Sequence, residues 1–331
     1  MTVQDLARVS STLAAASVAG RPRLSIVAPC YNEAACLSAF VSRMEAAARA
    51  CMAESYELIL VNDGSADATW AVIGQAAARS ANVVGVNLSR NHGHQLAVTA
   101  GLDLSRGDRV LIIDADLQDP PELLSTMMQM MDAGADVVFG RRRVRRGESA
   151  FKLATAKAFY RLLSSITEVD IPQDVGDFRL LTRDFVERLK AMPEQDRFLR
   201  GMVAWLGGRQ VELLYDRDPR HGGASGYSFG KMMKLAAAGM TSFSTAPLKL
   251  AVILSTLGAV LGLIIVPYAL IGFVTGGSQR GWTSLALITI FFGVGQFGCL
   301  AIIGAYVGRI FMQVKGRPLY QVGELIRRPD V

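Results

Sequence analysis

The chain has 331 residues, which is enough for a sizeable core and two structural units. Hydrophobic residues make up 51% of it and charged residues 19%, and the last third is far more apolar than the rest. This asymmetry indicates a polar domain followed by a membrane part. The net charge of +6 fits nucleic acid, anionic lipid or a polyphosphate substrate, but aromatic residues are not interleaved with the basic ones, so nucleic acid is not expected as a partner.

The first residues and the cysteines indicate a cytosolic environment. Residues 1–22 contain an alanine-rich run, but Asp5 precedes it and a strand follows directly, so no secretory signal is expected. The cysteines form no C-x-x-C pair and have no metal-finger spacing. We therefore expect reduced thiols at Cys30, Cys36, Cys51 and Cys299.

The first part of the chain alternates short β-branched apolar runs with helical segments. Strands are predicted at 24–28, 56–61, 83–88, 109–114 and 135–139. The polar loops that could carry chemistry always follow the carboxyl ends of these strands, as in the loop 29–33 that precedes a predicted helix over 34–52. The pattern predicts an α/β fold with a doubly wound, mostly parallel sheet. Neither G-x-G-x-x-G nor a phosphate-binding P-loop is present.

Two acidic residues in these loops have alternative interpretations. Glu33 is either a helix N-terminal acid, favoured by the helix dipole, or an acceptor of hydrogen bonds from a base or ribose. Asp63 follows the second strand, and Ser65 or Asp67 is expected to cap the next helix. A helix cap is a sufficient structural role for Asp67, but it does not require an acidic residue at position 63.

The stretch from Asp114 to Glu122 follows the fourth strand. Side chains at i and i+2 of an extended segment point the same way, so Asp114 and Asp116 would lie together at the edge of the sheet where ligands bind. Gln118 adds a carbonyl oxygen, and such oxygen ligands suit a divalent cation, Mg²⁺ or Mn²⁺, that bridges phosphates. The alternative is a solvated turn that caps the helix beginning near Pro120.

Four motifs in order resemble family 2 glycosyltransferases of the GT-A fold, and within them the polyprenyl-phosphate glycosyltransferases. This subgroup includes dolichyl-phosphate mannose synthases and bacterial undecaprenyl-phosphate glucosyl- and aminoarabinosyl-transferases. The motifs are Pro29-x-Tyr31-Asn32-Glu33, Asn62-Asp63-Gly64-Ser65, Arg90-Asn91-x-Gly93 and Asp114-x-Asp116-x-Gln118-Asp-Pro-Pro-Glu122. The resemblance runs from about Leu24 to Pro318. The processive-synthase signature Q-x-x-R-W is missing at Gln195, which argues against a polysaccharide polymerase.

The resemblance implies roles for particular residues. The nucleotide would be held by Pro29, Tyr31, Glu33, Asp63, Asn91 and Asp114. The metal would be held by Asp116 and Gln118, with Asp114. Residues implied in catalysis are Asp116, Arg142, Asp177 and Arg179. Those implied in binding the acceptor phosphate are Arg142, Lys157, Arg217, Arg220, Ser225 and Tyr227. Gly226 replaces a lysine that is usual in the family.

Two of these assignments have structural alternatives. The five arginines between Gly140 and Arg146 form either an anion clamp, since the planar guanidinium matches phosphate oxygens, or a solvated, membrane-facing surface. Asp177 and Arg179 contact either the sugar or acceptor phosphate, or each other in a salt-bridged turn.

The last third predicts a membrane anchor. Residues 227–247 fit an interfacial helix. The runs 250–279 and 281–308 contain no charge and are long enough to span a bilayer, which predicts a hairpin over 248–311 with spans at 250–275 and 283–308. A buried globular hairpin is the alternative. Basic residues flank the outer ends of the pair, so the domain 23–226 and both termini, including the tail 312–331, are expected in the cytoplasm, on the inner membrane.

The expected function is inverting transfer of a sugar from a UDP- or GDP-linked donor to a polyprenyl (undecaprenyl) phosphate, for modification of the cell envelope. The acceptor phosphate is largely anionic at pH 7, so no strong general base is needed. Membrane lipids are expected partners, and the resemblance allows a homo-oligomer. The alternatives are a transferase for another membrane acceptor, with Asp177 as general base, and a non-catalytic nucleotide-sugar-binding membrane partner.

Overall fold

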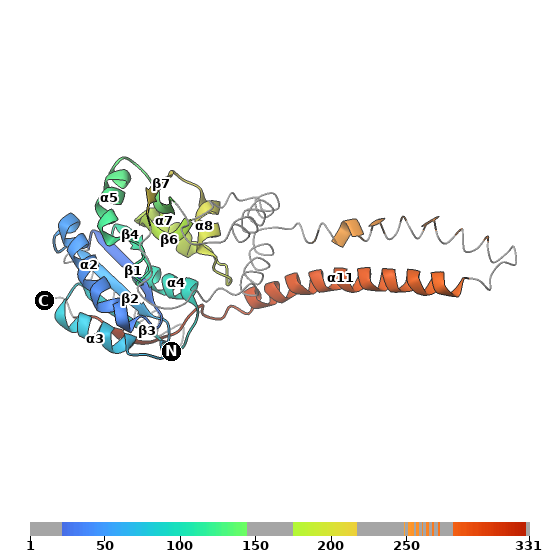
Figure 1. Cartoon of the computed structure of the whole chain (residues 1–331), viewed down its shortest axis with the longest axis horizontal. Coiled ribbons are helices and arrows are strands. Elements are labelled where there is room, and N and C mark those ends of the chain that lie inside the picture. The colour runs from blue at the N-terminus through green and yellow to red at the C-terminus, as the bar shows by residue number, and fades with distance from the viewer. Residues whose placement is uncertain are drawn as a thin grey trace. The chain divides into compact units, whose positions relative to one another are not determined.

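The computed structural model describes residues 22–143, 175–216, short parts of 248–271, and 281–328. The chain divides into two compact units. The first contains residues up to 150, residues 171–225 and residues 318–331. The second contains residues 151–170 and 226–317. Figure 1 shows the sheet and the helices of the first unit and the long helix α11 of the second.

The described strands form one eight-stranded sheet in the order β7-β5-β6-β4-β1-β2-β3-β8. Strand β1 pairs in parallel with β2 and β4, and the pairs β2–β3 and β5–β7 are also parallel. The pairs β4–β6, β5–β6 and β3–β8 are antiparallel. The strands are β1 (Leu24–Cys30), β2 (Tyr56–Asn62), β3 (Val83–Leu88), β4 (Arg109–Ile112), β5 (Val137–Arg142), β6 (Val175–Thr182), β7 (Gln210–Tyr215) and β8 (Val322–Ile326). The predicted α/β class with a mostly parallel sheet is confirmed.

Helices cover both faces of this sheet (Figure 1). Every residue of β1 and β2 is buried, as expected for central parallel strands covered on both sides. The helices of this unit are α2 (Ala34–Met52), α3 (Thr69–Arg79), α4 (His94–Leu104), the 3₁₀ turn η1 (Pro121–Leu123), α5 (Leu124–Asp132), α7 (Arg183–Ala191) and α8 (Leu199–Leu206). A Cβ at Gly101 of α4 would lie 2.2 Å from Cγ1 of Val27, so only glycine lets α4 approach β1 this closely.

The structure extends the sheet beyond the elements predicted from the sequence. Strands β6, β7 and β8 were not predicted. Strand β5 begins two residues later than expected and continues to Arg142, so Arg141 and Arg142 belong to a strand and not to the loop in which the sequence placed the arginine run. The carboxyl end of the predicted strand 109–114 is irregular, because β4 ends at Ile112.

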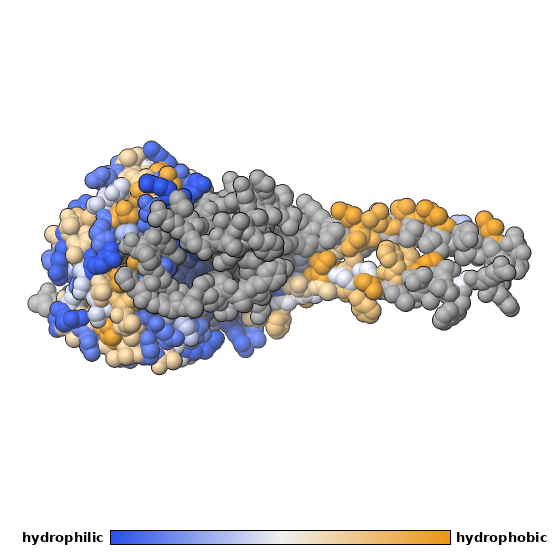
Figure 2. All heavy atoms as spheres, in the orientation of Figure 1, coloured by the Kyte–Doolittle hydropathy of each residue, from blue (hydrophilic) through white to orange (hydrophobic). Residues whose placement is uncertain are grey.

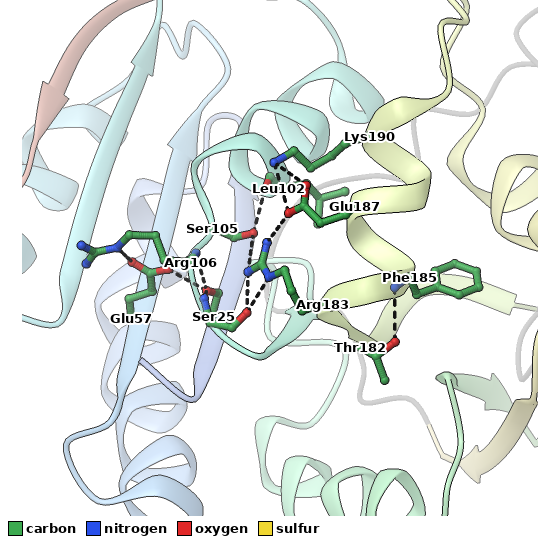
Figure 3. A network of polar contacts seen from close by, with 11 residues as sticks. Ser25, Glu57, Leu102, Ser105, Arg106, Thr182, Arg183, Phe185, Glu187 and Lys190 are labelled. Carbon is green, nitrogen blue, oxygen red and sulfur yellow. Dashed lines mark hydrogen bonds and ion pairs between the residues drawn. The ribbon is translucent and has the colours of Figure 1, made fainter. Parts of the chain in front are cut away.

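A polar network lies at the amino ends of the strands, opposite the predicted site (Figure 3). Glu57, the second residue of β2, is buried and accepts hydrogen bonds from Ser25 Oγ and from the Arg106 backbone, each at 2.6 Å. Arg327, just after β8, donates to Glu57 Oε2 at 3.0 Å. The network therefore ties the C-terminal tail to the centre of the sheet and is structural.

The second unit contains the long helix α11 (Trp282–Val314). Within it, Phe291–Val314 has a mean hydropathy of 1.6 and is the one helical segment of the described residues that is long and apolar enough to cross a membrane. Hydrophobic side chains such as Phe297 and Val307 are exposed along it, as the orange residues in Figure 2 show. The predicted interfacial helix 227–247 and most of the predicted span 250–275 lie outside the described residues.

Candidate active site

The turn after β4 contains three polar residues that are partly exposed. Burial alternates along it: Asp114, Asp116 and Gln118 are partly exposed, while Ala115 and Leu117 between them are buried. Leu117 has a φ of 60°, which costs a non-glycine residue about 1 kcal/mol and is tolerated here because its side chain is held in the core. The Gln118 N–H donates to Asp116 Oδ1 at 3.1 Å. The segment is a turn and not the extended strand end expected from the sequence, so a common ligand role for the three polar residues remains a prediction.

The residues that follow fasten this turn to the rest of the domain. Asp119 is buried, and its Oδ1 accepts a hydrogen bond of 2.5 Å from the hydroxyl of Tyr215 at the end of β7. Arg43 of α2 donates to both carboxylate oxygens of Glu122, at 3.0 and 2.9 Å. Both contacts use residues of the Asp-Pro-Pro-Glu segment for support, so we assign this segment a positioning role. The contribution of Tyr215 had no signal in the sequence.

The loops after β1 and β2 are bonded to each other. The Asn32 N–H donates to Ser65 Oγ at 3.0 Å, and Asn32 Oδ1 accepts from the Ala66 N–H at 2.9 Å. Asp67 accepts from the backbone of Ala34, at the start of α2, and from Thr69, at the start of α3. Asp67 thus bonds the first residues of both helices, although the N-cap residue of α3 is Ala68 and not the expected Ser65 or Asp67. These hydrogen bonds hold the two loops together, and Tyr31, in the loop after β1, is 51% exposed.

Asp63 holds the next loop in place. It is buried, and its two oxygens accept hydrogen bonds from the backbone N–H groups of His92 at 2.7 Å and Gly93 at 3.0 Å. These bonds fix the loop that carries Asn91. Contact of Asp63 with the nucleotide remains a prediction. The two hydrogen bonds from the backbone already account for the position of its carboxylate.

Asp177 is the centre of a charged cluster. Its carboxylate, almost fully buried on β6, accepts hydrogen bonds from Arg200 Nε at 2.8 Å and Gln95 Nε2 at 3.2 Å, and lies 2.9 Å from His94 Nε2. Arg179 Nη2, also buried, lies 3.8 Å from Asp177 Oδ1 and donates to the Gly176 carbonyl at 3.0 Å. Asp177 and Arg179 therefore form an ion pair, as in the structural alternative, but on strand β6 and not in a turn. Contact of either residue with substrate remains a prediction.

The cluster reaches the turn after β4 through His94. His94 Nε2 lies 3.7 Å from Asp114 Oδ1, which is buried and has no hydrogen-bond partner in the described part of the chain. His94 was visible in the sequence only as one of several basic residues in a loop. Arg200 had no signal there, because it reaches Asp177 from another helix.

The electrostatics follow from burial and these contacts. Burial alone would raise the pKa of Asp177, but the hydrogen bond from His94 and the charge of Arg200 hold it well below its usual range. Burial alone would lower the pKa of His94, but the hydrogen bond to Asp177 and the charge of Asp114 raise it to about 9. Burial raises the pKa of Asp114 to about 6, against the charge of His94. At pH 7, Asp177 is thus anionic and His94 cationic.

The described residues contain no group of three or more His, Cys, Asp or Glu side chains that could hold a metal. Two carboxylates and an amide oxygen, from Asp114, Asp116 and Gln118, nevertheless fit Mg²⁺ or Mn²⁺, which keep waters and take further ligands from a phosphate. Asp114 Oδ1 has no hydrogen-bond partner among the described residues and only a 3.7 Å ion pair with His94, which agrees with a cation ligand, since buried polar atoms normally have closer partners.

The remaining predicted residues are placed as follows. Pro29 lies within β1, and Glu33, between β1 and α2, accepts a hydrogen bond from Cys36 Sγ at 3.1 Å. Arg142 lies at the end of β5. Burial raises the pKa of Tyr215, and the hydrogen bond and charge of Arg142 act in the opposite direction on that pKa. The predicted acceptor residues that lie outside the described part of the chain are Lys157, Arg217, Arg220, Ser225 and Tyr227.

Known proteins resemble this chain in sequence over most of its length. The model of glycosyl transferase family 2 matches residues 25–190. YkcC, an uncharacterised glycosyltransferase of Bacillus subtilis, is 41% identical over 302 residues, which cover 90% of this chain and 92% of YkcC. The SfII prophage-derived bactoprenol glucosyl transferase of Shigella flexneri is 36% identical over 299 residues, or 90% of this chain and 96% of that protein.

Solved structures resemble it more distantly. A mannosyltransferase of Pyrobaculum calidifontis, in complex with GDP-Man and Mn²⁺, is 16% identical, has a TM-score of 0.43 and covers 85% of this chain and 88% of its own. The identity and coverage of the sequence relatives, together with the family model, confirm the resemblance: this chain belongs to glycosyl transferase family 2.

Proposed function

We propose that this chain transfers a sugar from a nucleoside-diphosphate sugar to the phosphate of a polyprenyl monophosphate, with inversion at the anomeric carbon. The observation that carries the proposal is the pair Asp114 and Asp116 at the carboxyl edge of the sheet, beside the cationic cluster around Asp177. Relatives named bactoprenol glucosyl transferase support a polyprenyl acceptor, and they make UDP-glucose the first donor to test.

The carboxylates would act through a divalent cation. Asp114, Asp116 and Gln118 would hold Mg²⁺ or Mn²⁺, which when bound would stabilise the charge of the departing diphosphate. The contribution of the chain is position: buried Leu117 and the bond from Tyr215 to Asp119 hold the turn in one shape before the donor arrives. Such preorganisation favours the transition state because no reorganisation is needed during the reaction.

The pKa of Asp177 favours a phosphate as the acceptor. The low pKa of Asp177, held down by His94 and Arg200, makes this carboxylate a poor general base. An acceptor hydroxyl would need such a base, whereas a phosphate monoester is already largely anionic at pH 7. This observation favours polyprenyl phosphate over a diacylglycerol or glycan acceptor, for which the sequence offered Asp177 as the base.

The C-terminal strand supports a membrane hairpin. Because β8 follows α11 in the chain and pairs with β3, the segments before and after the membrane part belong to the same folded sheet. Both must lie on one side of a bilayer. If α11 crosses once, a second crossing is required between residues 216 and 282, where the apolar run 250–279 lies. We therefore propose a two-span anchor with the sheet in the cytoplasm.

A transfer assay tests the proposal. The full-length chain in detergent is incubated with Mn²⁺, labelled UDP-glucose and undecaprenyl phosphate, and label in the organic phase is counted. Parallel reactions replace the acceptor with undecaprenol or diacylglycerol, and the donor with other UDP- and GDP-sugars. We expect organic-phase label only with the phosphate. Label on diacylglycerol alone would establish the other-acceptor alternative, and donor binding without any transfer would establish a non-catalytic partner.

Inversion has a separate readout. Donor sugars such as UDP-glucose carry an α linkage, so the product is expected to carry a β linkage. The coupling constant of the anomeric proton in an NMR spectrum of the purified product distinguishes the two. An α-linked product would refute inversion and leave the transferase assignment intact.

A further inference from the structure

The C-terminal tail, residues 318–328, belongs to the same compact unit as the sheet, although it follows the long helix α11 in the chain. Its strand β8 pairs with β3 from Gly85, opposite Ile326, to Leu88, opposite Val322. Where β3 ends, the loop 89–93 begins, which contains the predicted nucleotide ligand Asn91. The tail is therefore bonded to the strand that leads directly into this loop.

Two adjacent residues of the tail bind the two ends of the segment formed by loop 89–93 and helix α4. The carbonyl of Gln321 accepts a hydrogen bond of 2.9 Å from the N–H of Ser89, where the loop begins. The hydroxyl of Tyr320 donates to Asp103 Oδ2 at 2.7 Å, in the last turn of α4. A segment that is held at both ends loses less conformational freedom when a ligand binds to it.

The middle of the same loop is held from the other side, by the loop after β2. Asp63 accepts hydrogen bonds from the backbone of His92 and Gly93. A Cβ at Gly64 would lie 2.4 Å from the backbone nitrogen of Asn91, so the two loops are in direct backbone contact. Asn91 itself is exposed. The exposed part of the loop is thus a short stretch between the contacts of the tail and those of Asp63.

Covering the edge of the sheet is the simplest role for the tail. An unpaired edge strand invites pairing with other chains, so the pairing of β8 with β3 has a sufficient reason of its own. That role also includes the hydrogen bond of 3.2 Å from Trp70 Nε1, on α3, to Glu324 of β8. It does not require the bond from Tyr320 to Asp103, which lies outside the strand pairing and reaches the helix that follows the loop.

We propose that Tyr320 and Gln321 are positioning residues for the donor side of the active site. They hold the two ends of the segment 89–103, and Asn91 is thereby kept in place for the nucleotide. The folded unit that contains the site is incomplete without the tail, although nearly all of α11 and the chain before it separate the two in sequence. The inference rests on the proposed function for the identity of the ligand, but not for the fixing of the loop.

The test uses the full-length protein in detergent. Tyr320→Phe and Asp103→Ala each remove the bond between tail and α4, whereas Asp103→Asn keeps an acceptor for the Tyr320 hydroxyl. Glu324→Ala is the matched control, because it removes a hydrogen bond of the same tail to α3 and its side chain is exposed. Hydrogen exchange of the peptide that covers residues 89–93 measures the fixing of the loop. Calorimetry measures the affinity for UDP and for GDP with Mn²⁺, and thermal unfolding measures Tm.

We expect Tyr320→Phe and Asp103→Ala to speed exchange of the loop and to weaken nucleotide binding, each by about 3- to 10-fold, as loss of one hydrogen bond to a charged group does. The double variant should lose no more than either single variant, because both remove the same bond. Asp103→Asn and Glu324→Ala are expected to stay within about twofold of the wild type in both measurements. Glu324→Ala should nevertheless lower Tm about as much as Tyr320→Phe, since each removes one bond of the tail.

Three results would overturn the inference. The first is loop exchange in Tyr320→Phe and Asp103→Ala that equals that of the wild type. The second is an equal effect of Glu324→Ala on exchange or nucleotide affinity, which would reduce the tail to a cover for the sheet edge. The third is faster exchange with unchanged nucleotide affinity, which would remove the role at the donor side. A wild-type protein that binds neither UDP nor GDP would refute the proposed function, whereas the exchange measurement would still decide whether the tail fixes the loop.

Discussion

Replacing Asp177 by Asn is expected to destabilise the protein. The substitution keeps the shape of the side chain but leaves the buried guanidinium of Arg179 without its anion. Removing one partner of a buried ion pair costs about 3 to 5 kcal/mol. The lower end applies here, because His94 and Arg200 are partly exposed and water screens their charges. For a domain of this size, about 3 kcal/mol corresponds to a fall in Tm of roughly 6 to 12 °C.

Thermal unfolding of the full-length protein, followed by tryptophan fluorescence, measures this effect. Asp184→Asn is the matched control: its side chain is 78% exposed and pairs with Arg188 at 2.8 Å, so a change below about 1 kcal/mol is expected. If Asp177→Asn and Asp184→Asn shifted Tm equally, the reasoning that Asp177 neutralises a buried cation would be refuted.

The difference in Tm between wild type and Asp177→Asn should also depend on pH, measured with EDTA. Because the folded pKa of Asp177 is depressed, its contribution is present above the unfolded value of about 4 and is lost as the pH falls through the folded value. Asp177 and Asp114 raise the pKa of His94 to about 9. The stability that protonated His94 gains from these carboxylates is therefore complete below about pH 6.5 and is lost as the pH rises through about 9. The difference should therefore be largest between about pH 5 and 6.5, and a difference that keeps growing up to pH 10 would contradict this assignment.

Two further substitutions test the packing around the site. Tyr215→Phe removes the donor to buried Asp119 and should cost about 1 to 3 kcal/mol, seen as a lower Tm; an unchanged Tm would show that the bond does not support the turn. Gly101→Ala places a methyl group 2.2 Å from Val27 and should also cost about 1 to 3 kcal/mol, whereas Gly293→Ala, where nothing lies within 4 Å, serves as the neutral control. Equal Tm values for the two alanine variants would contradict the close approach of α4 to β1.

Local sequence patterns predicted the strands that are buried on both faces. The uninterrupted apolar runs of β1, β2 and β3 identified strands within two residues of their observed ends, because both faces of these strands are buried. Strand β6 escaped prediction because Asp177 and Arg179 interrupt its apolar run with charges that are buried only through tertiary pairing. Strand β8 escaped because its partner, β3, lies more than 200 residues earlier in the chain.

In the site, too, local features could be predicted from the sequence and long-range contacts could not. A local period of two residues predicted that Asp114 and Asp116 share one side, and in the structure Asp114, Asp116 and Gln118 are partly exposed while Ala115 and Leu117 are buried. The cluster of His94, Asp177 and Arg200 could not be predicted, because its members come from two helices and a strand separated by 83 and 23 residues. A one-dimensional pattern contains no information on such contacts.

We propose that Asp116 enables sugar transfer to a lipid phosphate through a divalent cation. The most direct test measures transfer of labelled glucose to undecaprenyl phosphate by Asp116→Asn and by Asp184→Asn, across a titration of Mn²⁺. We expect Asp184→Asn to match the wild type, and Asp116→Asn to lose transfer at every Mn²⁺ concentration while its Tm stays within about 2 °C of the wild type, since Asp116 is partly exposed. Full transfer by Asp116→Asn with an unchanged requirement for Mn²⁺ would contradict a metal-binding role for Asp116.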